Sequence, residues 1–169
     1  MVVRPITADD LPGAVALERA LVAAQVGQVR TVADLPDDDQ VFVERLTRRL
    51  DDGGLWWVAE EGGRIVGGVS VQRPGPSLLA HVGSLGIGVH PDVQGRGVGR
   101  QLMVAAMQAA RAAGVERLEL GVRADNPRAI RLYESLGFVT EGVRARFVRL
   151  PDGRYVDDHL MVCWLEPRG

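Results

Sequence analysis

A glycine- and arginine-rich segment near the middle of the chain carries the strongest chemical signal in the sequence. It reads Gln94-Gly95-Arg96-Gly97-Val98-Gly99-Arg100 and leads directly into residues with the apolar spacing of a helix. Backbone N–H groups at a helix start bind anions, and glycine lets a phosphate come close to the backbone. Arg96 and Arg100 would add charge-assisted hydrogen bonds. The segment therefore predicts a site for a phosphate or pyrophosphate group.

The residues before this loop predict a strand with one bare face. Leu85, Ile87 and Val89 alternate with Gly86 and Gly88, so the glycines share a face. Glycine within a strand often marks the close approach of a ligand; the alternative is a position crowded by a neighbouring element. The bare strand, the anion-binding loop and the helix start together fit one long ligand. An extended amide-bearing arm could pair with the strand while a pyrophosphate lies on the loop. Coenzyme A has that shape.

Other phosphate-binding chemistries fit the sequence less well. The loop glycines fall as G-x-G-x-G, which differs from the dinucleotide fingerprint, and no Gly-Lys-Ser/Thr is present. All 20 basic residues are arginine, which excludes a lysine Schiff base with pyridoxal phosphate. The net charge of -2 gives no general attraction to nucleic acid or anionic membranes. A nucleotide-binding enzyme remains an alternative, which stabilisation by ATP or NAD but not by coenzyme A would favour.

Alternating and helical patterns predict the elements that must position these residues. The expected order is β-α-α-β-β-β-α-β-α-β-β, an α/β domain with a mixed, mostly antiparallel twisted sheet and flanking helices. Thr7 caps the first helix, and Asp37 to Asp39 open a second with Val41, Phe42, Leu46 and Leu50 as its apolar stripe. Asp51 to Gly54 end that second helix. The expected strands are 2–6, 55–60, 65–71, 79–89, 117–123, 138–150 and 155–165, and the later helices are 97–113 and 126–137.

Length and composition bound the organisation of the protein. A chain of 169 residues fits one domain, so we expect residues 1–169 to form a single unit. The N-terminus lacks the pattern of a signal peptide and no apolar run is long enough to span a membrane, so we expect a cytoplasmic protein. Cys163 is the one cysteine, in an apolar run, and is predicted to be a buried structural thiol.

Two separate motifs give the sequence a specific resemblance. Ile87-Gly88-Val89-His90-Pro91, followed by Gln94-x-x-Gly97-x-Gly99, resembles the cofactor motif of the GNAT superfamily of N-acetyltransferases. Downstream, Asn126-Pro127-x-Ala129-x-x-Leu132-Tyr133-x-x-x-Gly137-Phe138 resembles the second signature of that superfamily. The tail from Glu141 to Asp157 is similar to the branch with amino-acid, phosphinothricin and ribosomal-protein N-acetyltransferases. The resemblance implies acetyl-CoA as cosubstrate and no metal.

The resemblance also implies roles for individual residues. Backbone groups of Ile87, Gly88 and Val89 would contact the pantetheine arm or polarise the thioester carbonyl, with Asn126 near the same arm. The loop residues Gly95, Arg96, Gly97, Val98, Gly99 and Arg100 would hold the pyrophosphate. Tyr133 would be the general acid for the leaving thiolate; the alternative is an aromatic ring packed beside Leu132 and Phe138.

The general base is less well defined by the sequence. Many members of the superfamily carry a glutamate where this chain has Gly121, which cannot act as a base. Glu119 lies two residues earlier on the same strand face and is our candidate; the alternatives are an exposed carboxylate in a cross-strand pair and a water relay. His81 and His90 are weaker candidates. The histidines and Cys163 lack the spacing of metal ligands, so no metal site is expected.

The acceptor is expected to depend on residues 11–50 and on the last hairpin, 144–158. Both segments are rich in carboxylates, which would attract a cationic amine or simply form a solvated face; they are Asp37, Asp38, Asp39, Glu44, Asp157 and Asp158. We expect a small-molecule amine or amino-acid-like acceptor, with a protein N-terminus as the alternative. A non-catalytic acyl-CoA-binding module is a further alternative. The apolar run 160–165 suggests a sheet continued into a partner, and hence a homodimer.

Overall fold

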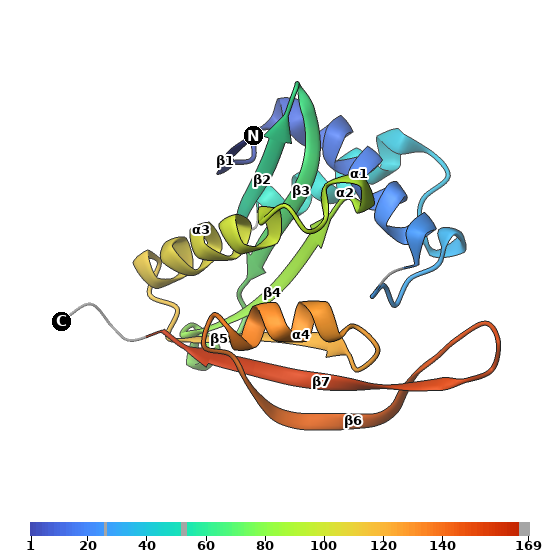
Figure 1. The fold of residues 1–169 in the computed structure, drawn as a ribbon. Helices are drawn as coiled ribbons and strands as arrows, with labels where there is room; N and C mark the ends of the chain where they lie inside the picture. The colour runs from blue at the N-terminus through green and yellow to red at the C-terminus, as the bar shows by residue number, and fades with distance from the viewer. Residues whose placement is uncertain (26, 52–53, 166–169) are drawn as a thin grey trace.

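A single seven-stranded sheet organises the molecule (Figure 1). The computed structural model describes residues 1–25, 27–51 and 54–165. The strands lie in the order β1-β2-β3-β4-β5-β7-β6, and every neighbouring pair is antiparallel except β4 with β5. This arrangement confirms the expected mixed, mostly antiparallel α/β fold. The strands are β1 (Val2–Pro5), β2 (Leu55–Glu61), β3 (Arg64–Gln72), β4 (Val82–Val89), β5 (Arg117–Arg123), β6 (Val139–Arg149) and β7 (Tyr155–Trp164).

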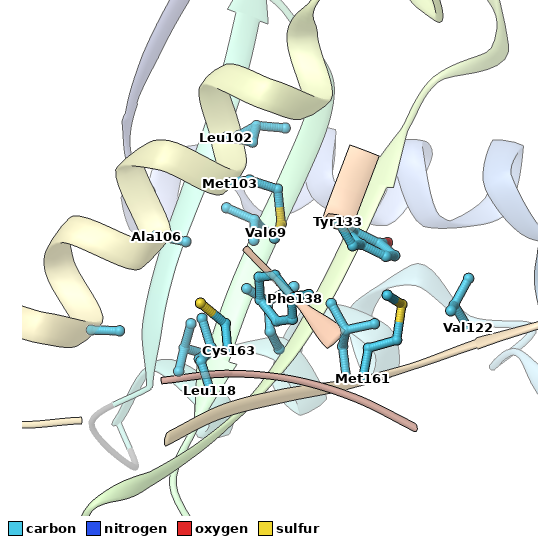
Figure 2. Packing of buried hydrophobic residues seen from close by; sticks show 14 of the residues in the cluster. Val69, Leu102, Met103, Ala106, Leu118, Val122, Tyr133, Phe138, Met161 and Cys163 are labelled. Carbon is cyan, nitrogen blue, oxygen red and sulfur yellow. The ribbon is translucent and has the colours of Figure 1, made fainter. Parts of the chain in front are cut away.

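Helices cover the two faces of the sheet differently. α3 (Val98–Ala112) and α4 (Pro127–Glu134) pack on one face, where Leu102, Met103 and Phe138 are fully buried (Figure 2). α1 (Leu11–Ala24) and α2 (Asp39–Asp51) lie on the opposite face and cover the half of the sheet around β2, β3 and β4. The β5–β7–β6 half of that opposite face has no helix over it in the described part of the chain.

Local signals set most element boundaries as expected. The β2–β3 hairpin turns at Gly62 and Gly63, with φ of 60° and 79°, which only glycine adopts without strain. Thr7 begins the turn into α1, and the Asp10 carboxylate accepts hydrogen bonds from the Thr7 backbone N–H and hydroxyl. Asn126 caps α4 by accepting from the Ala129 N–H at 3.2 Å.

The aspartates at 37–39 open α2 as expected: the helix begins at Asp39, and the Asp38 side chain accepts from the Gln40 N–H. Two other expectations about boundaries and faces were wrong. β4 begins at Val82 instead of Leu79, because Ser77–Leu79 forms a 3-10 turn after the prolines. Val41 is exposed, because Phe42 and Leu46 define the buried face. The predicted helix end at Asp51 to Gly54 includes residues 52–53, which lie outside the described residues.

The last strand, β7, lies inside the sheet between β5 and β6. Its apolar residues are explained by this central position, and β6 is the edge strand at this end of the sheet. The apolar character of β7 is therefore no argument for a sheet continued into a partner. Within the described residues, no helix has the length and apolar character needed to cross a membrane.

Candidate active site

The two parallel strands at the centre of the sheet separate after a short contact. β4 pairs with β5 only from Val82 to Ser84, whereas β4 pairs with β3 along its whole length from Ser84 to Val89. Beyond Ser84 the strands diverge (Figure 1). The edge of β4 from Leu85 to Val89 that faces β5 has no strand partner among the described residues, so its backbone groups are available to an extended ligand. These are the residues predicted to contact pantetheine.

The glycine-rich loop lies at the end of this unpaired edge. Gly95 and Gly97 have φ of 84° and 81°, which side-chain-bearing residues rarely adopt, and Gly97 is the N-cap of α3. The first N–H groups of α3 have no acceptor within the helix. A bare left-handed loop, free helix N–H groups and an unpaired strand edge fit a pyrophosphate followed by an amide-bearing arm.

The side chains of the loop are arranged less simply than the sequence suggested. Arg96 forms an ion pair with Glu61 at 2.6 Å, and Arg100 donates to the Ser135 hydroxyl at 2.7 Å. Gln94 donates to the Val89 carbonyl at 3.1 Å and so ties the loop to the end of β4. Val98 is fully buried. The loop therefore offers backbone donors, while both guanidinium groups would have to leave present partners to reach a phosphate.

Tyr133 lies on α4 with its ring in the core next to Phe138 (Figure 2). Only 7% of the residue is exposed, and burial raises the pKa of its hydroxyl to about 12. The Tyr133 hydroxyl makes no hydrogen bond to a described residue. Among the described residues, every fully buried side-chain oxygen or nitrogen has a hydrogen-bond partner, so an oxygen without a partner is not fully buried. The hydroxyl therefore keeps access to the surface. It is protonated at neutral pH and has a free donor.

Glu119 lies at the last pair between β4 and β5, and Asn126 follows the end of β5. The Asn126 side-chain oxygen is used by the α4 cap, which leaves its amide N–H₂ as the group available to a ligand. Glu119 is on β5 opposite Ser84, and 43% of its side chain is exposed. Its partner is Arg117 on the same strand at 3.3 Å, where we had considered a cross-strand pair. Arg117 bonds more closely to Glu141, at 2.5 Å.

A cavity of about 290 Å³ lies on the opposite face of β4, under α1 and α2. Its floor is the bare side of the sheet at Gly68, Ser70, Gly86 and Gly88. A side chain at position 88 would overlap Leu21 of α1, so crowding by a neighbouring element explains this glycine. Charged groups ring the cavity, including the ion pair between Glu18 and Arg30. The cavity is suited to hold a small polar molecule against β4.

The predicted acidic rim does not form one solvated face. Asp39 pairs with Arg19, Asp157 accepts from the Arg146 N–H, and Asp158 is buried beside Arg144. The sequence analysis named Asp158 among the acceptor-region carboxylates but did not predict its burial or its ion pair with Arg144. Arg144 and Asp158 occupy the space next to Gly121, where a β-carbon would lie 3.1 Å from the Asp158 carboxylate. The alternation of β7 was a usable signal, since it puts Asp158 on the same face as Glu119 and Gly121.

The histidines and the cysteine have structural environments. The His90 side chain accepts from the Asp92 N–H at the end of β4, as expected for a residue that terminates the strand. Cys163 is buried, as predicted, and burial raises the pKa of its thiol. In the described part of the chain, no group of three His, Cys, Asp or Glu side chains could hold a metal ion.

Comparison with known proteins gives a consistent result. Residues 24–138 match the model of the acetyltransferase (GNAT) family. A mycothiol acetyltransferase from Beutenbergia cavernae is 35% identical over 125 residues, which cover 70% of this chain and 41% of that protein. The N-alpha-acetyltransferase RimI from Mycobacterium tuberculosis is 41% identical over 92 residues, covering 54% of this chain and 56% of the relative. The chain thus spans about half the length of these curated relatives.

A solved structure agrees over the full length. The ribosomal-protein-alanine N-acetyltransferase from Brucella melitensis superimposes with a TM-score of 0.86 at 27% identity. The match covers 98% of this chain and all of the other. The whole fold described above, including the hairpin of β6 and β7, is therefore shared with that protein.

Proposed function

This chain belongs to the acetyltransferase (GNAT) family, and on that premise we propose that it transfers the acetyl group of acetyl-CoA to a primary amine. The single observation that carries the proposal is the separation of β4 from β5 directly before the glycine-rich loop. An unpaired strand edge of five residues leading to free helix N–H groups suits coenzyme A better than a compact nucleotide. We further propose that residues 1–169 act as one domain, since one continuous sheet unites them.

The reaction requires one proton donor for the leaving sulfur, and Tyr133 is proposed for this role. The neutral amine nitrogen attacks the thioester carbonyl carbon, the C–S bond breaks, and the Tyr133 hydroxyl gives its proton to the thiolate. The nitrogen then loses its extra proton, which restores the Tyr133 hydroxyl, so the products are an amide and a free thiol. The raised pKa of Tyr133 keeps the proton in place at every working pH. Burial in apolar surroundings also raises the pKa of the leaving thiol. The pKa values of the tyrosine hydroxyl and of the thiol are therefore shifted in the same direction, and proton transfer between them stays feasible.

Backbone groups of Ile87, Gly88 and Val89 are proposed to orient the thioester. N–H donors aimed at a developing oxyanion typically contribute about 3 kcal/mol each. Glu119 is proposed to accept the proton that the acceptor ammonium loses, because its carboxylate is exposed on the face of the sheet that carries Gly86. Asn126 is proposed to hold the pantetheine region through its free amide.

We propose a small amine or amino-acid-like molecule as the acceptor. The cavity under α1 and α2 supports this, because it is about the size of a small ligand and lies against Gly86 and Gly88. A protein N-terminus is the second candidate, favoured by the similarity to the N-alpha-acetyltransferase and to the ribosomal-protein-alanine acetyltransferase. A cytoplasmic location and homodimerisation stay as proposals from the sequence.

A screen of acetyl-CoA consumption tests the proposal. The protein is incubated with acetyl-CoA and amino acids, polyamines, aminoglycosides or short peptides, and free thiol is measured. Turnover with a small amine is the expected result. Acetylation of an alanine-starting peptide and of no small amine would reverse the ranking of the acceptors. Tight acetyl-CoA binding by calorimetry without turnover of any amine would instead favour a non-catalytic acyl-CoA-binding module.

A further inference from the structure

The space beside Gly121 is filled by a carboxylate from another strand. A β-carbon at position 121 would lie 3.1 Å from Asp158 Oδ2 and 3.1 Å from Arg144 Nη2. Asp158 belongs to β7, and its strand neighbour on β5 is Arg123. An ion pair of a carboxylate and a guanidinium therefore lies at this point of the β5 surface, although the residue there has no side chain.

The position of this carboxylate relates it to the proposed reaction. Gly86 and Gly121 each lie two residues beyond Ser84 and Glu119, the last pair between β4 and β5. The two glycines are thus opposite one another across the gap between the diverging strands. Gly86 also forms part of the cavity floor, and Arg123 donates to the carbonyl of Gln28 in the cavity wall at 2.7 Å. Asp158 is not one of the residues that line the cavity, but it lies on the same face of the sheet as the cavity floor, beyond the gap between β4 and β5.

Only one oxygen of the carboxylate is committed. Arg144 donates to Asp158 Oδ2 from Nε at 3.1 Å and from Nη2 at 2.5 Å. Oδ1 accepts no hydrogen bond from any described residue, although the residue is only 3% exposed. Since no fully buried side-chain oxygen or nitrogen in the described chain lacks a partner, Oδ1 must reach the surface. Oδ1 is a fixed anionic acceptor with a free position.

We propose that Asp158 binds and orients the ammonium group of the acceptor, with Arg144 as the residue that positions it. This inference rests on the proposed function and specifies how the acceptor is recognised. Arg144 holds the carboxylate through Oδ2 alone, which leaves Oδ1 to accept a hydrogen bond from a cation. An aspartate is a much weaker base than an amine, so proton removal is left to another group. Asp158 thus supplies from β7 a carboxylate in the space that a side chain at position 121 would occupy.

Kinetics of the Asp158→Asn variant test the proposal in the full-length protein. The amide keeps the shape and loses the charge, so KM for the best amine of the screen should rise about ten- to hundredfold. The KM for acetyl-CoA should stay unchanged. Asp152→Asn, in the β6–β7 turn, is the matched control on the same hairpin. An unchanged amine KM in Asp158→Asn would overturn the inference and leave the proposed function intact.

A relocation variant separates recognition from a structural role. Asp158→Ala removes the two carboxylate oxygens that a β-carbon at position 121 would approach and leaves the flexible end of Arg144 at 3.1 Å. Gly121→Glu then returns a carboxylate from β5, with which Arg144 can pair. The double variant should reverse most of the rise in the amine KM that Asp158→Ala alone causes. If the amine KM rises equally in the single and the double variant, and the two variants have equal melting temperatures, the proposal is contradicted.

A binding measurement covers the case in which variants fail to fold or the screen finds no acceptor. The ¹⁵N-labelled wild-type protein is titrated with ethylammonium chloride, and sodium chloride at equal ionic strength is the control. Saturable shifts of the Gly121 and Leu160 backbone amides are expected, since both residues lie next to Asp158 on this face. Shifts that are absent, or equal with sodium, would overturn the inference whatever the outcome of the screen.

Discussion

The rings of Tyr133 and Phe138 pack against each other with their centroids 6.0 Å apart and their planes tilted by 53°. Phe138 is fully buried and holds the tyrosine ring in place, while the tyrosine hydroxyl reaches the surface without a hydrogen bond from a described residue. This contact holds in place a phenolic donor that makes no hydrogen bond to a described residue.

Replacing Tyr133 by Phe should reduce catalysis and leave binding unchanged. The ring and its contact with Phe138 remain, so the melting temperature should not fall. Loss of the proton donor should lower kcat by about 10² or more. Steady-state kinetics and calorimetry with acetyl-CoA measure the two effects. Tyr155→Phe is the control, because Tyr155 is exposed on the β6–β7 hairpin. Full turnover in Tyr133→Phe would remove the proposed acid.

Replacing Gly97 by Ala should weaken acetyl-CoA binding. Gly97 has a φ of 81°, and a side-chain-bearing residue there costs about 1–2 kcal/mol or shifts the loop. The N–H groups of α3 would then no longer meet the pyrophosphate, and the dissociation constant should rise. Gly63→Ala in the β2–β3 turn is a matched control, since its φ is 79° and no atom lies near either position. Equal acetyl-CoA affinity in the two variants would argue against the loop as the phosphate site.

Replacing Glu119 by Gln should produce a pH-dependent loss of activity. A base matters most when the acceptor amine is protonated, so activity should fall near pH 7 and recover as the pH approaches the pKa of the amine. The pH profile of kcat/KM for the best amine measures this. Glu141→Gln is the control, because Glu141 bonds the same Arg117 but lies on the exposed edge strand. A profile identical to wild type would leave a water relay as the proton acceptor.

Asp10 should contribute to stability at neutral pH but not in strong acid. The bidentate bond from Arg4, at 2.7 Å to each oxygen, holds the pKa of Asp10 well below its usual range. A depressed folded-state pKa gives stability that is complete above the unfolded value of about 3.9 and is lost as the pH falls through the folded value. Thermal denaturation should therefore show Asp10→Asn destabilised at pH 7, with the difference from wild type shrinking below about pH 4. The exposed neighbour Asp9→Asn should show no such trend.

The sequence determined the features that depend on neighbouring residues. Alternation and helical spacing predicted the order of strands and helices, and the β5 boundaries agree at both ends. The glycines at 95 and 97 predicted a glycine-rich loop before a helix, and Asn126 with Pro127 predicted the start of α4. Backbone conformation, capping and amphipathic periodicity are local, so a single chain records them directly.

Tertiary structure alone decided which groups meet. The separation of β4 from β5, the central position of β7 and the overlap of Leu21 with the space above Gly88 depend on strand pairing and helix packing between distant segments. The ion pair of Arg96 with Glu61 and the position of Asp158 beside Gly121 have the same origin. Long-range packing leaves no fixed spacing in the chain. The sequence therefore predicted acetyl-CoA as the donor, whereas only the fold showed the carboxylate and the cavity that we propose for the amine.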